Sequence, residues 1–256
     1  MVTTTHRAEP VMGTVVSFDV RTPGDHTGAI DAACAWLHDV DAMFSPFRPD
    51  SAISRIGRGE LALDAAPDDV RMALAACDDL ERTTAGVFTA WPNGRLDPSG
   101  YVKGWAAERA SQILVEHGAL DHVVNAGGDV RVRGRSGHGG GWRVAIAHPC
   151  VRDACCTIVA IDRGAVATSG TAERGAHVVD GRTGAPATAL ASVTVAADDL
   201  TSADVVATIA LALGLDARAW LLALDGCEAY VVDAHGFEWA TPRFPFAPDA
   251  PQAHRT

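Results

Sequence analysis

The chain has 256 residues, of which 48% are hydrophobic and 21% are charged, a composition typical of a soluble globular protein with a sizeable core. Its formal net charge of −11 at pH 7 argues against the basic surface of a protein that binds nucleic acid or an anionic membrane. An acidic protein that binds a polyphosphate must therefore supply positive charge locally, through a metal ion, a lysine or backbone amides.

The first ten residues, from Met1 to Pro10, contain neither the apolar stretch nor the small-residue cleavage site of a signal peptide. They also contain no cysteine for lipid attachment, and no run of the sequence approaches 18 uninterrupted apolar residues. The six cysteines show neither Cys-x-x-Cys nor zinc-ligand spacing, which favours reduced structural thiols. We therefore expect a cytoplasmic protein without membrane insertion.

Predicted helices and strands alternate without a regular βαβ repeat, which indicates an α+β fold built as a single mixed domain. The predicted elements are a strand at 11–20, helices at 29–44, 70–83 and 102–117, strands at 122–124, 129–133, 142–146, 157–162, 165–168, 176–180 and 191–195, a helix from Asp204, a short helix at 217–224 and a last strand at 228–232. The domain is expected to span residues 1–241. Residues 242–256, with four prolines, are expected to form a loosely ordered tail.

The segment from Asp97 to Trp105 combines a helix start with a basic side chain. Pro98 and Ser99 are typical of the first residues of a helix, so Lys103 would lie near its first turn. The helix dipole favours acidic side chains there, and a lysine is explained if an anion also binds at the site. The alternative is a solvated lysine.

A glycine pair lies between two predicted strands, at Gly127 and Gly128. Glycine can adopt positive φ and lets a ligand approach the backbone, but Gly-Gly is equally favoured in a tight hairpin turn. The Gly-x-Gly-x-x-Gly spacing and the following helix of a Rossmann fingerprint are absent. The sequence therefore leaves a ligand loop and a hairpin turn as alternatives.

Two polar segments follow the strand predicted at 165–168. Thr168 to Thr171 could present successive backbone amides to a phosphate, or could form a plain polar loop. His177 and Asp180 could together hold a catalytic proton, or Asp180 could form an Asx-turn into Gly181.

Asp204 and Thr208 lie four residues apart in an apolar helix that ends at Gly214, so both side chains lie on one face near its start. Two hard oxygen donors suit Mg²⁺, which takes few protein ligands and keeps phosphate oxygens or water. The alternative is that Thr201 or Ser202 caps the helix, that Asp204 complements its dipole, and that Thr208 is merely small.

Taken in order, these segments resemble the ApbE family of FAD:protein FMN transferases. The matching motifs lie at 11–14, 44–55, 97–104, 125–129, 167–170, 177–184 and 203–208. Seven co-linear motifs are far more specific than any one of them.

The resemblance implies an α+β fold that holds FAD with Mg²⁺, transfers FMN to a Ser or Thr hydroxyl of a target flavoprotein and releases AMP. It implies metal ligation by the side chains of Asp204 and Thr208 and by the backbone carbonyl of Gly100. His177 and Asp180 would lie at the catalytic edge. The implied FAD contacts are Met12, Phe47, Thr89, Ala90, Trp91, Asp97, Lys103, Gly127, Gly128, Ser169, Gly170 and His177.

Two other functions compete with protein flavinylation. One is an FAD-binding or FAD-hydrolysing protein of the same fold, and the other is an unrelated metal-dependent phosphohydrolase. A yellow colour on purification would disfavour the phosphohydrolase. Release of AMP from FAD would separate a transferase from a binding module.

Overall fold

The computed structural model describes residues 4–137, 141–171, 178–251 and 254–255. The helices within these ranges include α1 (Thr27–Phe44), α2 (Ala52–Gly57), α3 (Asp68–Thr83), α4 (Ser99–Glu116), α5 (Leu200–Leu213) and α6 (Ala217–Leu222). The strands are β1 (Thr5–Val11), β2 (Thr14–Val20), β3 (His122–Ala126), β4 (Asp129–Arg133), β5 (Trp142–Ala147), β6 (Cys155–Ile161), β7 (Gly164–Gly170), β8 (Leu190–Ala197), β9 (Cys227–Asp233), β10 (Glu238–Ala240) and β11 (His254–Arg255).

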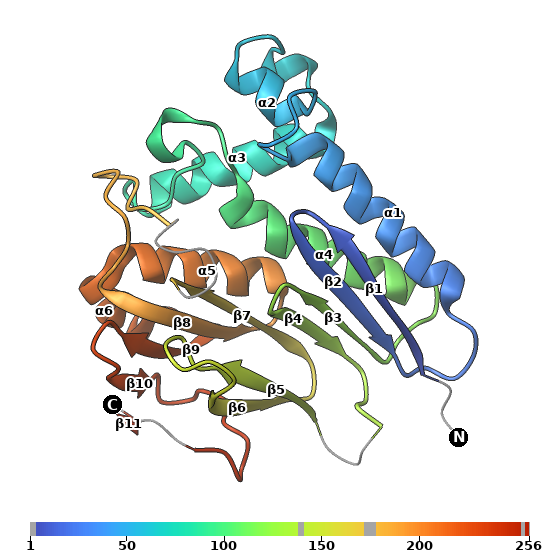
Figure 1. The fold of residues 1–256 in the computed structure, drawn as a ribbon, viewed down its shortest axis with the longest axis vertical. Helices are drawn as coiled ribbons and strands as arrows, with labels where there is room; N and C mark the ends of the chain where they lie inside the picture. Colours follow the sequence, from blue (N-terminus) through green and yellow to red (C-terminus); the bar gives the residue numbers. More distant parts are fainter. Residues whose placement is uncertain (1–3, 138–140, 172–177, 252–253, 256) are drawn as a thin grey trace.

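Nine of the described strands form one sheet in the order β1-β2-β3-β4-β7-β8-β9-β10-β11. Its pairs are antiparallel except for β10 with β11, so the α+β prediction is confirmed. Helices α4 and α5 pack on one face, and the β5–β6 hairpin packs against the other, which gives three layers (Figure 1). Figure 1 also shows α2 and α3 at the end of the molecule away from that hairpin.

Two sequence-based predictions are wrong, one about a strand and one about the C-terminal segment. The strand predicted at 11–20 is the end of β1, a turn and β2, because Met12 and Gly13 adopt positive φ of 56° and 69° and reverse the chain. The segment expected to be a loose tail packs on the protein over residues 242–251. Phe244 and Ala247 are buried there, and the Ala247 N–H donates to the Ile158 carbonyl at 2.7 Å.

Helix α5 occupies the centre of the fold. The stretch Leu200–Leu222 is long and apolar enough to cross a membrane by length and composition alone. In the structure, nine residues of α5 are buried between the sheet and α4, and the chain breaks its helix at Gly214, whose φ is 59°. Its N-cap is Asp199, whose side chain accepts from the Ser202 N–H at 2.9 Å. The capping role considered for Thr201 or Ser202 therefore belongs to Asp199.

Helices α4 and α5 touch at Gly104. A methyl group placed on Gly104 would lie 2.6 Å from the Leu200 carbonyl oxygen and 2.7 Å from Asp204 Cβ. These separations are shorter than any relaxed carbon contact, so only glycine fits. The Gly104 N–H donates to Asp204 Oδ2 at 2.9 Å.

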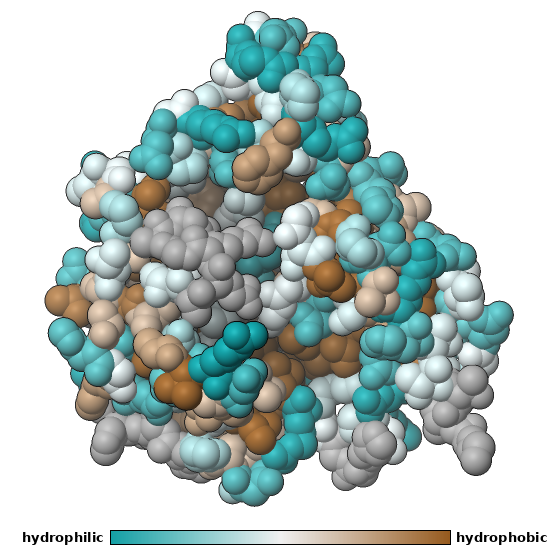
Figure 2. Space-filling model, in the orientation of Figure 1, coloured by the Kyte–Doolittle hydropathy of each residue, from teal (hydrophilic) through white to brown (hydrophobic). Residues whose placement is uncertain are grey.

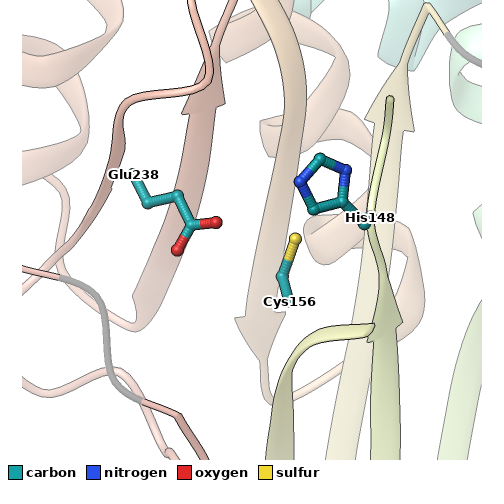
Figure 3. A group of neighbouring side chains, drawn as sticks. All are labelled: His148, Cys156 and Glu238. Atoms are coloured by element: carbon teal, nitrogen blue, oxygen red, sulfur yellow. The ribbon is translucent and has the colours of Figure 1, made fainter. Parts of the chain in front are cut away.

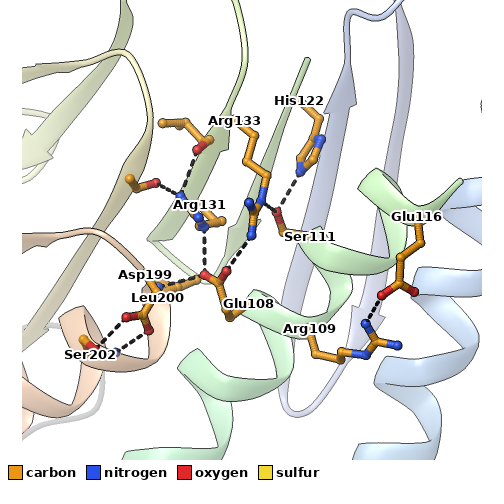
Figure 4. A network of polar contacts seen from close by, with 12 residues as sticks. Glu108, Arg109, Ser111, Glu116, His122, Arg131, Arg133, Asp199, Leu200 and Ser202 are labelled. Atoms are coloured by element: carbon orange, nitrogen blue, oxygen red, sulfur yellow. Dashed lines mark hydrogen bonds and ion pairs between the residues drawn. The ribbon is translucent and has the colours of Figure 1, made fainter. Parts of the chain in front are cut away.

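One turn further along α4, buried Glu108 joins three elements (Figure 4). Its Oε2 accepts from the Leu200 N–H at 2.9 Å, at the first residue of α5. Its two oxygens lie 2.7 Å from Arg131 Nε and 2.8 Å from Arg133 Nη2, both on β4. The start of α5 is therefore fixed to α4 and to the sheet by one carboxylate.

We expect Gly104→Ala to destabilise the protein by about 1–3 kcal/mol, because the added methyl forces α4 and α5 apart. Gly28→Ala in α1 is the matched control, since a methyl there meets nothing within 4 Å. That control should be neutral or stabilising by up to about 1 kcal/mol. Urea denaturation measures both free energies of unfolding, and equal effects would contradict the close contact.

His122 predicts a pH dependence of stability. Burial lowers its pKa to about 4, and its ring lies 2.7 Å from both Ser111 Oγ and the Ala119 carbonyl. Because the unfolded chain binds the proton near pH 6.5, this site destabilises the fold as pH falls from about 6.5 to 4, by about 3 kcal/mol in total. His122→Gln should flatten that slope in urea denaturation, and exposed His235→Gln should not. An unchanged slope in His122→Gln would refute the assignment.

Candidate functional site

Helices α4 and α5 meet the sheet at the end where β1 turns into β2 and β3 turns into β4 (Figure 1). The β1–β2 turn and the β3–β4 turn lie side by side there, and the Gly127 N–H donates to the Val15 carbonyl at 3.2 Å. The end of β7 joins them, since the Thr168 N–H donates to Asp129 Oδ1 at 3.0 Å. Five residues from these elements form what we call the buried centre: Lys103, Asp129, Ser169, Asp204 and Thr208.

The buried centre contains two carboxylates and one ammonium. Lys103 Nζ lies 2.6 Å from Asp129 Oδ2 and 3.3 Å from Asp204 Oδ1. Both carboxylate side chains are 2% exposed, whereas the lysine side chain is 29% exposed. Sequence reasoning did not single out Asp129 as a site residue. Its signal was an acidic residue directly after Gly127–Gly128, at the first position of a buried strand.

Burial disfavours the charged forms of the Asp204 and Lys103 side chains. Burial raises the pKa of Asp204 to about 7, although the Lys103 charge lowers it. Burial also lowers the pKa of Lys103, but the charges of Asp204 and Asp129 outweigh it, so the net direction is upward and the ammonium keeps its proton. One positive charge therefore serves two buried carboxylates, and an additional cation beside Asp204 would stabilise its ionised form.

The three predicted metal-binding residues lie together. Asp204 and Thr208 occupy one face of α5, and a methyl placed on Gly100 would lie 3.4 Å from Thr208 Cγ2. The Gly104 N–H, four residues after Gly100 on α4, donates to Asp204 Oδ2. These are hard oxygen donors around a buried carboxylate, so the residues present fit Mg²⁺.

Ser169 and Gly170 lie within β7, so the phosphate-binding turn considered from the sequence does not form there. The strand continues because Ser169 and Gly170 pair with Val193 and Ser192 of β8. The Ser169 hydroxyl instead faces α5, 3.2 Å from the Thr208 hydroxyl. Ser169, predicted to contact FAD, therefore lies beside the predicted metal ligand Thr208.

The start of α4 is held against the loop before it. Asp97 Oδ1 accepts from the Ser99 N–H at 3.1 Å, and the Asp97 N–H donates to the Ala90 carbonyl at 2.8 Å. Thr89 Oγ1 accepts from the Trp91 N–H at 3.0 Å. The structure thus gathers four of the residues predicted to contact FAD beside Gly100. Among them, Trp91 is exposed and Ala90 is buried.

Phe47 lies apart from the buried centre. The residue is 84% exposed, and the Arg95 guanidinium lies 5.5 Å from the centroid of its ring. An exposed aromatic face beside a cation can stack on a planar ligand without rearrangement of the core.

The Gly127–Gly128 pair is a hairpin turn, with positive φ at both residues and Asn125 Oδ1 accepting from the Gly128 N–H at 2.8 Å. The turn also borders an open groove of about 600 Å³, lined by Gly13, Thr14, Val15, Ser17, Asn125, Gly127 and Gly128. Met12, which packs against the core, precedes this lining. Figure 2 shows apolar side chains gathered over β2–β4 on this face. A hairpin turn and a ligand-facing surface are therefore compatible here.

His177 lies outside the described residues, and Asp180 lies on the loop that follows. Asp180 forms the Asx-turn considered from the sequence, because its Oδ1 accepts from the Arg182 N–H at 3.0 Å. The Arg182 guanidinium also donates to both Asp180 oxygens and lowers its pKa. The loop contacts the α4 side of the site, since the Gly181 N–H donates to the Val87 carbonyl. A carboxylate so engaged is suited to orienting a neighbour rather than to accepting a proton.

A second group of potential metal ligands lies between the β5–β6 hairpin and β10. It consists of His148, Cys156 and Glu238, whose ligand atoms are all within 4.8 Å of one another (Figure 3). His148 Nδ1 accepts from the N–H groups of Cys150 and Val151, each at 3.0 Å. The neutral ring therefore carries its proton on Nε2, the nitrogen that Figure 3 shows turned toward Cys156. This group presents an N–H donor rather than a free lone pair, and we assign no metal to it.

The fold is shared with solved structures. An ApbE protein from Thermotoga maritima aligns with a TM-score of 0.80 and 22% identity over 92% of this chain and 96% of that chain. The flavin transferase ApbE from Vibrio cholerae aligns with a TM-score of 0.79 and 21% identity over 90% and 94% of the two chains.

Curated relatives give closer sequence matches. The FAD:protein FMN transferase of Klebsiella pneumoniae (strain 342) is 32% identical over 60% of this chain and 47% of its own length. That of Rhodobacter capsulatus is 30% identical over 81% of this chain and 39% of its own length. The chain thus spans about half or less of these relatives. The ApbE family model matches residues 12–91 and 89–231, so the chain belongs to the ApbE family.

Proposed function

We propose that this protein catalyses Mg²⁺-dependent transfer of FMN from FAD to a Ser or Thr hydroxyl of a target flavoprotein, with release of AMP. The observation that carries the proposal is the buried centre, where α4, α5, β4 and β7 bring a lysine and oxygen donors together at one solvent-accessible end of the sheet. FAD:protein FMN transferases among the relatives support the choice of substrate and reaction.

In this reaction the acceptor hydroxyl oxygen attacks the phosphorus on the FMN side of the FAD diphosphate. The bond from that phosphorus to the AMP oxygen breaks, AMP leaves, and the hydroxyl proton passes to a base. Asp204, Thr208 and the Gly100 carbonyl would hold Mg²⁺, which when bound offsets the charge that develops on the diphosphate. The Gly104 N–H fixes the Asp204 carboxylate, and Lys103 supplies a further positive charge.

We assign the base to His177, because an imidazole titrates near neutral pH. Asp180 is the alternative base, but the Arg182 guanidinium donates to both of its carboxylate oxygens. We therefore propose that His177 accepts the proton and that Asp180 helps to position the loop on which it lies.

Incubation of the protein with FAD, Mg²⁺ and candidate acceptors, followed by intact mass measurement, tests the function. We expect one FMN adduct on an acceptor and an equal amount of AMP. Asp204→Asn should reduce the rate by at least about a hundredfold, since metal stabilisation of the transition state is worth several kcal/mol. Asp153→Asn, on an exposed turn, is the matched control. Release of FMN and AMP without any adduct would instead assign FAD hydrolysis.

We expect His177→Ala to slow transfer by about 10²–10⁴-fold while FAD affinity stays within about threefold, as for the loss of a general base. Asp180→Asn should slow transfer less, because Arg182 already holds its carboxylate. Transfer rates and FAD fluorescence titrations of the two variants distinguish these roles. A larger loss in Asp180→Asn than in His177→Ala would exchange them.

A further inference from the structure

Lys103 is the only lysine of the chain, and the other twenty of its 21 lysine and arginine residues are arginines. The arginines of the surface pair with acidic residues in contacts such as Arg58–Glu60 and Arg71–Asp68. The single lysine lies instead between two carboxylates that are almost completely buried. The position therefore uses a cation of a different shape from every other basic site.

The shape of the ammonium explains its place. A guanidinium is a planar fork with five donors, whereas an ammonium is a compact point charge with three. Two of those donors face Asp129 and Asp204. The described residues supply no third partner for the ammonium, and 29% of the lysine side chain is exposed.

The formal charges at this point constrain what else can bind. With Asp204 ionised, the form that a metal ion beside it would bind, Asp129, Asp204 and Lys103 sum to −1, so Mg²⁺ alone would leave a buried charge of +1. The FAD diphosphate carries two negative charges, and its entry together with Mg²⁺ returns the sum to −1. Without Lys103, Mg²⁺ alone would neutralise the two carboxylates. Uncompensated charge is costly in a desolvated site, so the lysine penalises Mg²⁺ that arrives without an anion.

We propose that Lys103 couples the two ligands, so that the buried centre takes Mg²⁺ and the FAD diphosphate together rather than Mg²⁺ alone. The inference rests on the proposed function for the identity of the ligands. It adds to that function a preference of the site for the metal–diphosphate pair over the metal alone, and it assigns this preference to Lys103. By linkage, the factor by which FAD strengthens Mg²⁺ binding equals the factor by which Mg²⁺ strengthens FAD binding.

Calorimetry of Mg²⁺ alone, FAD alone and Mg²⁺ in the presence of FAD tests the coupling in wild type, Lys103→Met and Lys103→Arg. We expect Lys103→Met to bind Mg²⁺ alone about tenfold more tightly and FAD with Mg²⁺ about tenfold more weakly, while its affinity for FAD alone stays unchanged, so that the coupling falls about tenfold. Lys103→Arg should keep part of the coupling. Arg71→Met, which removes a surface cation from α3, should change none of these values by more than about twofold. Weaker or unchanged binding of Mg²⁺ alone in Lys103→Met would overturn the proposal.

A measurement on the wild-type protein covers the case in which Lys103→Met fails to fold. With ¹⁵N-lysine labelling, the single lysine gives one side-chain ammonium signal in NMR spectra. We expect that signal to change little with Mg²⁺ alone and to shift when Mg²⁺ and FAD are both present. A full shift with Mg²⁺ alone, or none with the pair, would overturn the coupling. Because both experiments measure binding only, a missing FMN adduct would refute the proposed transfer without deciding the coupling.

Discussion

The close approach of α4 and α5 at Gly104 is the contact on which the functional end of the protein depends. Because Gly104 has no side chain, its N–H reaches the Asp204 carboxylate, and the two helices meet almost backbone to backbone. Glu108, one turn along α4, holds the first residue of α5 by its N–H. Two polar contacts one turn apart therefore set both the distance and the register of these helices. A slip of one turn would separate Asp204 from Lys103.

The sheet adds the other half of the site through its own register. Asp129 begins β4 directly after a two-residue turn, and its second oxygen accepts from the Thr168 N–H of β7. Ser169, the next residue, then faces Thr208 of α5. Since successive residues of a strand point to opposite faces, a shift of one residue between β4 and β7 would turn one of these groups away from the helix. The buried centre therefore depends on two registers, that of α4 against α5 and that of β4 against β7.

Local sequence patterns predicted the α+β class, the long helices and the Ser99 start of α4, because apolar periodicity and capping residues act over a few neighbours. They missed the turn at Met12–Gly13, where a methionine adopts a positive φ that its own propensity disfavours. They placed Ser169 in a turn because its hydroxyl-rich neighbours look like a loop, whereas pairing with a distant strand decides its conformation. The packing of residues 242–251 was missed for the same reason. Their prolines still offer carbonyl acceptors, and Phe244 finds an apolar surface more than 80 residues earlier in the chain.

The residues of the candidate site also differ in whether local sequence patterns could predict them. The pair Asp204 and Thr208 could be read from helical spacing alone, but Asp129 could not, because its role depends on a lysine 26 positions away on another element. The structure also changes the meaning of Lys103. Helix-dipole reasoning suggested an anion near the first turn of α4, and the nearest anions are two carboxylates of the protein itself. In a chain with a net charge of −11, surface acids can be screened by water and salt, whereas buried ones cannot. The protein therefore places its one lysine where screening fails, and a divalent cation that joins it there leaves an excess positive charge unless an anion enters with it.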